Sequence, residues 1–213
     1  MEKYVHKRIK YYLDNNVKFH EVRVGNYIAD VKRGNQIYEI QTQNFKLLLD
    51  KIEYYIHCGY NVTIVYPVIN NRYIVTVDDN WRVIKRRKSA YKGVIQDSLL
   101  EIYWIHKYLN NDLFNLKILL VDVEDIKVEN RTDVVRQVSG FSGELAINNI
   151  MNLKCMVPST LGIRFTSSEF IKESKSRKKR IASGVKLLRE LGIIKQVDKK
   201  GNTLIYERNF GVN

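Results

Sequence analysis

The sequence predicts an α/β protein in which a mixed sheet flanked by helices is followed by a small module of helices and a hairpin. Three observations predict it: apolar residues at helical spacing near the start of the chain, several short runs with strand character, and a second set of helix signals near the end. With 213 residues, the chain has room for a medium and a small domain. We expect the first at 1–130, a linker or helical connector at 131–157 and the second at 158–213.

Residues 2–13 are expected to form an amphipathic helix, because Val5, Ile9 and Leu13 recur on one face. Glu2 extends the same face, so its carboxylate is a candidate third acid that this helix delivers to the hairpin that follows. The alternative is a first-turn glutamate that the helix dipole favours.

The residues from 27 to 42 are expected to form two strands around a two-residue turn at Gly34-Asn35, a pair that suits a tight hairpin loop. Counting back from this turn places Asp30 opposite Glu39, on the same face of the hairpin. Two facing carboxylates repel unless a cation neutralises them, and Mg²⁺ typically binds through one or two carboxylates with water and phosphate. The hairpin is therefore a candidate site for Mg²⁺ or Mn²⁺. The alternative is an acid beside a turn and a glutamate that faces solvent.

The middle of the chain is expected to alternate between helices and strands. Apolar residues recur at helical spacing from Phe45 to Ile56, and Gly59 supplies the stop. The apolar run at 62–66 is typical of a buried strand in a mixed sheet, and Pro67 is expected to close it. The remaining elements are expected in this order: a hairpin at 73–77 and 81–84, a helix at 92–109, a closing strand at 116–128 and a polar linker from 130.

The formal net charge of +13 predicts a polyanionic partner. Nucleic acid is the usual candidate and an anionic membrane surface is the alternative, although no apolar run is long enough to span a bilayer. The N-terminus is too charged for a signal peptide, and two cysteines are too few for a disulfide framework, so a cytoplasmic location is expected. The basic cluster at 85–88 is either a solvated loop or a phosphate contact.

Residues 158–213 hold 13 basic residues against 5 acidic ones, which indicates a separate basic module. Thr166 and Glu169 have the spacing of a capping box at the start of a short helix, which a basic helix at 177–191 follows. Strands at 194–197 and 203–206 then flank a basic turn. This order resembles a winged helix-turn-helix, which lays its second helix in the major groove of duplex DNA and its hairpin against the backbone.

The resemblance implies DNA contacts from two basic clusters, whereas the alternative for the first is a solvated helix face. The expected contact residues are Arg177, Lys178, Lys179 and Arg180 on the helix, and Lys199 and Lys200 at the wing.

The first half of the chain resembles the core of the PD-(D/E)XK nuclease superfamily. The motif is Asp30 followed by Glu39-Ile40-Gln41, with Gln41 where most members have lysine. The resemblance implies a restriction-endonuclease-like sheet in which the two acids and the Ile40 carbonyl hold Mg²⁺ or Mn²⁺. It also implies that Gln41 orients a water molecule.

Two further residues enter through this resemblance. Lys46 is expected to supply the ammonium that Gln41 lacks, and Lys32 is a poorer candidate. Glu2 would match the helix-borne acid of resolvase-like members. Nearly the whole chain also resembles an uncharacterised bacterial family, in which a segment like Glu39–Thr42 leads a chain that ends in a winged helix.

The expected function is therefore metal-dependent hydrolysis of double-stranded DNA by an endonuclease that its C-terminal module positions. One alternative is a DNA-binding regulator whose nuclease fold has lost its activity, which the Gln41 substitution favours. Another is an RNA-processing nuclease, which the winged helix argues against. A homodimer would suit the cutting of both strands.

Overall fold

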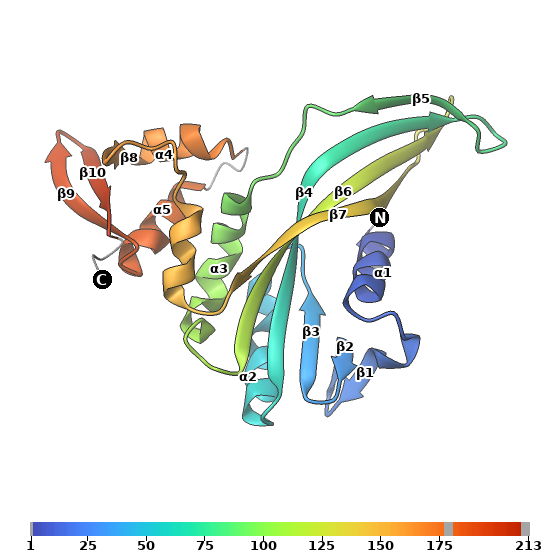
Figure 1. Cartoon of the computed structure of the whole chain (residues 1–213), viewed down its shortest axis with the longest axis horizontal. Coiled ribbons are helices and arrows are strands. Elements are labelled where there is room, and N and C mark those ends of the chain that lie inside the picture. The colour runs from blue at the N-terminus through green and yellow to red at the C-terminus, as the bar shows by residue number, and fades with distance from the viewer. Residues whose placement is uncertain (1, 177–180, 210–213) are drawn as a thin grey trace.

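The computed structural model describes residues 2–176 and 181–209, without the side chains of residues 2 and 3. Its larger part is a mixed sheet of seven strands with helices on both faces, which confirms the α/β class (Figure 1). The elements of this part are α1 (Glu2–Leu13), β1 (His20–Val24), β2 (Tyr27–Arg33), β3 (Gln36–Ile40), α2 (Leu49–His57), β4 (Asn61–Val77), β5 (Val83–Lys88), α3 (Leu99–Ile105), β6 (Phe114–Val128) and β7 (Val134–Ile147).

The strand order β1-β2-β3-β4-β6-β7 combines an antiparallel meander with two parallel pairs. The strand β2 runs antiparallel to both β1 and β3, whereas β3 with β4 and β4 with β6 are parallel. The strand β7 returns antiparallel along β6, and β5 pairs with the last part of β4. The helix α2 connects β3 to β4, as a parallel pair requires.

Each face of the sheet has its own apolar core because side chains alternate along the strands. On one face, α1 packs through Val5 and Ile9 against Ile40, Val65 and other strand residues. On the other face, α2 and α3 pack against the alternate positions of the same strands, such as Ile64. The helix expected at 2–13 is thus confirmed, and its apolar stripe faces the sheet.

The strand β4 continues through Pro67 to Val77, so the expectation that Pro67 ends it is wrong. Pro67 pairs with Leu119 of β6. The backbone carbonyls of Val65 and Ile69, two residues to either side, accept hydrogen bonds from Gln41 and Gly93 on the opposite edge. Pro67 therefore turns its missing N–H toward that edge, beyond the end of β3, where a proline is tolerated.

The segment 131–157, expected as a linker, instead contributes β7 and a 3₁₀ helix at Ile150–Met156. The strand β7 pairs with β6 from Lys127 to Leu116, and two register shifts interrupt the ladder. Most of its side chains are at least partly exposed, with Val138 and Ile147 buried. An outer strand of this kind has a weak apolar pattern, which explains why the sequence suggested a linker.

The C-terminal part contains a three-stranded sheet with the order β8-β10-β9 and two helices. Its elements are β8 (Arg164–Thr166), α4 (Ser167–Ser174), α5 (Ile181–Glu190), β9 (Ile194–Lys200) and β10 (Thr203–Arg208). The capping box of Thr166 and Glu169 is confirmed, with the glutamate N–H donating to the threonine hydroxyl at 3.2 Å. Residues 177–180, the expected start of the basic helix, lie outside the described residues.

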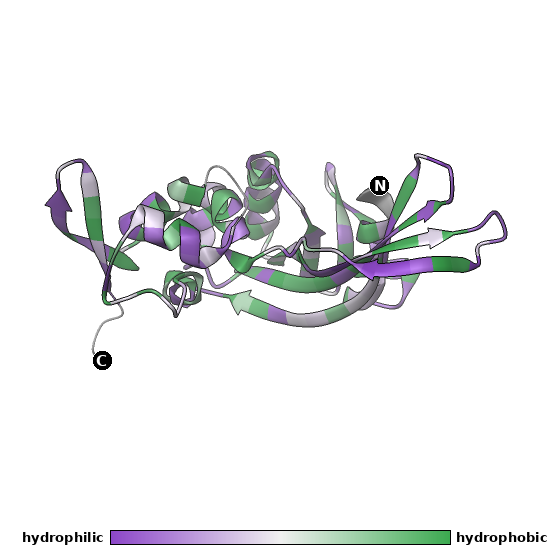
Figure 2. Ribbon diagram, turned by 90° about the horizontal axis from the view of Figure 1, so that it is seen from above, coloured by the Kyte–Doolittle hydropathy of each residue, from purple (hydrophilic) through white to green (hydrophobic). Residues whose placement is uncertain are grey.

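The C-terminal part is joined to the large sheet through α3 and α5. At Gly184 of α5, an added Cβ would lie 2.8 Å from the Cβ of Leu99, so glycine allows the two helices to approach closely. Buried residues of both parts belong to one continuous apolar core. Seen from above, the molecule is elongated, with the C-terminal sheet at the end opposite the β5 hairpin (Figure 2).

Candidate functional site

The hairpin of β2 and β3 turns at Gly34, whose φ of +57° suits glycine, as expected. The backbone pairing between the two strands ends at Val31 and Tyr38. At the next position a side chain replaces it, because the Ile40 N–H donates a hydrogen bond of 2.8 Å to Oδ2 of Asp30. The half-buried carboxylate of Asp30 thus lies where the two strands separate.

Glu39 is 3% exposed and lies within reach of α2. Its Oε2 accepts a hydrogen bond of 2.7 Å from Nζ of Lys51, whose side chain is 18% exposed. Lys51 also donates a bond of 2.7 Å to the carbonyl of Ile28 in β2. The ammonium of Lys51 therefore connects the two strands just beyond the end of their backbone pairing.

Burial is the largest cause that raises the pKa of Glu39, to about 7. The positive charge of Lys51 opposes this shift, and the negative charge of Asp30 adds to it. Burial raises the pKa of the Tyr55 hydroxyl as well, and the negative charges of Glu39 and Asp30 raise it further. Asp30 and Glu39 are therefore within electrostatic range of each other.

Oε1 of Glu39 and the hydroxyl of Tyr55 are both buried, and neither forms a hydrogen bond of good geometry in the described part of the chain. The two groups nevertheless interact, because the Tyr55 hydroxyl lowers the pKa of Glu39 as a hydrogen-bond donor does. A buried oxygen without a partner carries a desolvation cost that a ligand can relieve. No group of three or more His, Cys, Asp or Glu side chains gathers among the described residues. A divalent ion would therefore depend on Asp30 and Glu39 with water and phosphate, a donor set that fits Mg²⁺.

Lys51 was not among the residues singled out from the sequence. The expected ammonium donor, Lys46, lies elsewhere, with its Nζ 5.3 Å from the ring centroid of Trp104 in α3. Residues 45–48 form a 3₁₀ turn, so α2 begins at Leu49 and turns Lys51 toward Glu39. The available signal was the position of Lys51 one turn before the buried Tyr55 and beside the buried Ile52.

The other expected site residues have the following places. The amide of Gln41 donates a hydrogen bond of 2.6 Å to the carbonyl of Gln43, and its backbone N–H extends the pairing of β3 with β4. Ile40 contributes its N–H to Asp30, whereas metal ligation by its carbonyl stays a prediction. The Nζ of Lys32 lies 5.0 Å from the ring centroid of Tyr60. The side chain of Glu2 lies outside the described residues.

Asp30 also lines a groove of about 780 Å³ between α1 and the first strands. Most of the charged or ionisable residues around it are basic: His6, Lys7, Lys10 and His20 accompany Glu21 and Asp30. Lys10 is paired with Glu21 at 2.7 Å. The groove lies beside α1 and gives Asp30 access from solvent, and its basic wall is suited to phosphate. Glu39 instead contacts Lys51 of α2, which packs on the other face of the sheet, so a common face for the two carboxylates stays a prediction.

In the C-terminal part, Lys199 and Lys200 are exposed at the end of β9, next to the turn at Gly201. The structure thus places them at the tip of a hairpin, as expected. Arg177, Lys178, Lys179 and Arg180 lie outside the described residues.

A family model described as a domain of unknown function (DUF8091) matches residues 3–144, which is more than half of the chain. The chain belongs to the DUF8091 family. The DUF8091 match covers Asp30, Glu39 and Lys51 and ends within β7, so it spans most of the large sheet. No curated protein and no solved structure matches the chain. Within the described ranges, none of the helices combines the length and the apolar character needed to cross a bilayer.

Proposed function

We propose that this DUF8091 protein is a Mg²⁺- or Mn²⁺-dependent endonuclease of double-stranded DNA. The observation that carries the proposal is the contact of 2.7 Å between Lys51 and Glu39, beside Asp30. Two acids and a lysine at one end of a hairpin are the residue types that a PD-(D/E)XK nuclease uses. The lysine comes from the following helix and replaces the one that Gln41 displaces from the motif.

Asp30 and Glu39 would hold the ion, using the oxygen of Glu39 that Lys51 does not bind. The bound ion supplies a water of lowered pKa and neutralises negative charge at the scissile phosphate. Lys51 favours the ionised form of Glu39 and would place a positive charge beside the reacting phosphate. Gln41, at the end of β3, would orient the attacking water by hydrogen bonding.

The C-terminal part would position the duplex as a winged helix. Its support is the element order strand, helix, helix, strand, strand, and a sheet in which β10 lies between β8 and β9. The exposed Lys199 and Lys200 would contact the DNA backbone from the tip of the hairpin. The basic residues 177–180 precede the described start of α5 and would face the major groove.

Plasmid nicking in Mg²⁺ or Mn²⁺ tests the proposal. The variant Lys51→Met should lose on the order of 10²-fold in rate, because it removes a charge that acts on the transition state. Lys46→Met is a matched control, since it removes an exposed lysine five residues away and should stay within about twofold of the wild type. Nicking by an Asp30→Ala/Glu39→Ala protein at the wild-type rate would refute the proposal.

The second candidate is a DNA-binding regulator with an inactive nuclease fold. The observation that favours it is that the ammonium of Lys51, 2.7 Å from Glu39, supplies a counter-charge of the kind that a metal ion would supply. Calorimetric titration with Mn²⁺ separates the two candidates. The nuclease should show a binding event that Glu39→Ala abolishes, whereas the regulator should show none in either protein.

A further inference from the structure

At the outer end of the large sheet, where β5 joins β4, β6 and β7, the two faces differ in charge. Cross-strand partners lie on the same face of a sheet, so the strand pairing shows which side chains share a face. One row consists of Arg87, Ile74, Asp125 and Arg136, and the next consists of Lys85, Thr76, Lys127 and Val134. Together with Arg72, two residues before Ile74, these rows place five cations around one carboxylate. We call this surface the Asp125 face.

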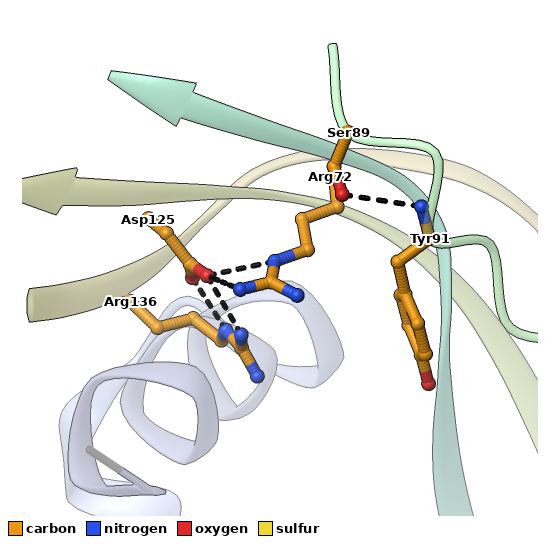
Figure 3. A network of polar contacts seen from close by, with 5 residues as sticks. All are labelled: Arg72, Ser89, Tyr91, Asp125 and Arg136. Atoms are coloured by element: carbon orange, nitrogen blue, oxygen red, sulfur yellow. Dashed lines mark hydrogen bonds and ion pairs between the residues drawn. The ribbon is translucent and has the colours of Figure 1, made fainter. Parts of the chain in front are cut away.

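The Asp125 face is organised around a buried carboxylate held by two arginines (Figure 3). Asp125 is 3% exposed. It accepts hydrogen bonds from Nε of Arg72 at 2.7 Å and from Nε and Nη2 of Arg136 at 2.6 and 2.8 Å. Burial alone would raise the pKa of Asp125, but these bonds outweigh it and hold the pKa below its ordinary value. The single negative charge of Asp125 therefore orients two guanidiniums, and the three groups together keep a net positive charge.

Beside these arginines lies a hollow of about 250 Å³, lined by Arg72, Arg87, Asp125 and Lys127 with two apolar residues. Arg87 and Lys127 are exposed. Among the described residues, neither side chain forms a hydrogen bond or an ion pair. A guanidinium has five N–H donors, so Arg72, which lines the hollow, retains further donors for a ligand after binding Asp125. The hollow is thus cationic and open, and its carboxylate is already satisfied.

The opposite face of the same strands has its charges balanced. Arg86 donates to Glu124 at 3.1 Å, and its guanidinium lies 3.8 Å from the ring centroid of Tyr73. Lys88 pairs across the strands with Tyr73 and acts electrostatically on Asp122. The excess charge of the basic run 85–88 is therefore directed to the Asp125 face, where Lys85 and Arg87 lie.

We infer that the Asp125 face binds backbone phosphates of DNA, as a second contact in addition to the C-terminal part. The identity of the polyanion rests on the proposed function. Fixed guanidiniums with free donors match the tetrahedral oxygens of a phosphate, and the exposed Arg87 and Lys127 add charge without a competing acid. The duplex would thus contact the large sheet as well as the tail.

Fluorescence anisotropy with a labelled 20-base-pair duplex, in EDTA and over a series of NaCl concentrations, tests this inference. Arg87→Ala/Lys127→Ala should weaken binding on the order of tenfold and reduce the slope of log K against log [NaCl] by about 2, because two phosphate contacts are lost. Arg86→Ala/Lys88→Ala removes the same charge from the opposite face of the sheet, at β5, and is the matched control. Lys85→Ala/Lys127→Ala provides a second pair on the Asp125 face, and thermal unfolding checks each fold.

The outcomes distinguish this inference from the proposed function, since EDTA prevents metal-dependent cleavage. A wild-type protein that does not bind the duplex would overturn both. Binding that the Asp125-face pairs and the control pair weaken equally would overturn this inference alone, because net charge and not a particular face would then set the affinity.

Discussion

Replacing Glu39 by glutamine converts a buried carboxyl that titrates into an amide that does not. Burial raises the pKa of Glu39 from 4.5 to about 7 in the folded protein. The folded state then binds the proton more tightly than the unfolded chain. The resulting stabilisation is present below pH 4.5 and is lost as the pH rises through 7. At about 1.4 kcal/mol per pH unit, the difference between the two pKa values corresponds to about 3 kcal/mol.

The glutamine variant does not undergo this loss. The free energy of unfolding of Glu39→Gln minus that of the wild type should therefore increase by about 3 kcal/mol between pH 4.5 and pH 8. Urea unfolding of both proteins at several pH values measures the difference, and the subtraction cancels the other titrating groups. Glu53→Gln serves as the control, because Glu53 is bound by Lys107 and Tyr108 and its pKa is lowered. A Glu39→Gln difference that stays constant across this range would refute the reasoning.

Two further predictions concern stability. Asp125→Asn should lower the free energy of unfolding by about 3 kcal/mol, because it leaves two guanidiniums without their buried counter-charge; unchanged urea unfolding would contradict this. Gly184→Val should destabilise the protein by about 1–3 kcal/mol, since even its Cβ would lie 2.8 Å from that of Leu99. A melting temperature equal to that of the wild type would show that α3 and α5 have room to separate.

The features that the sequence predicted correctly depend on local chemistry. The pair Gly34-Asn35 determines the hairpin turn, and Thr166 with Glu169 determines the start of α4, because each signal is complete within a few residues. Counting from the turn placed Asp30 opposite Glu39, but the backbone pairing of the two strands ends one position earlier, at Val31 and Tyr38. The geometry of the acids therefore depends on the bond from Ile40 to Asp30, which no pattern in the sequence indicates.

The features that the sequence did not predict depend on contacts between distant segments. Pro67 stays inside β4 because β3 has ended at that edge, and β7 is a strand because β6 is available to pair with it. Lys51 could not be chosen over Lys46 without knowing where the 3₁₀ turn ends, since a shift of a few residues rotates the whole face of a helix.

The close seating of α5 on α3 has a consequence for where DNA would be cut. Leu99 and Gly184 belong to helices that share one continuous core, so the tail has little freedom to swing relative to the hairpin. A duplex bound by the C-terminal part would then contact Asp30 and Glu39 at a constant number of base pairs from that binding site. Cleavage would therefore occur at a fixed distance in base pairs from the DNA sequence or structure that the C-terminal part recognises.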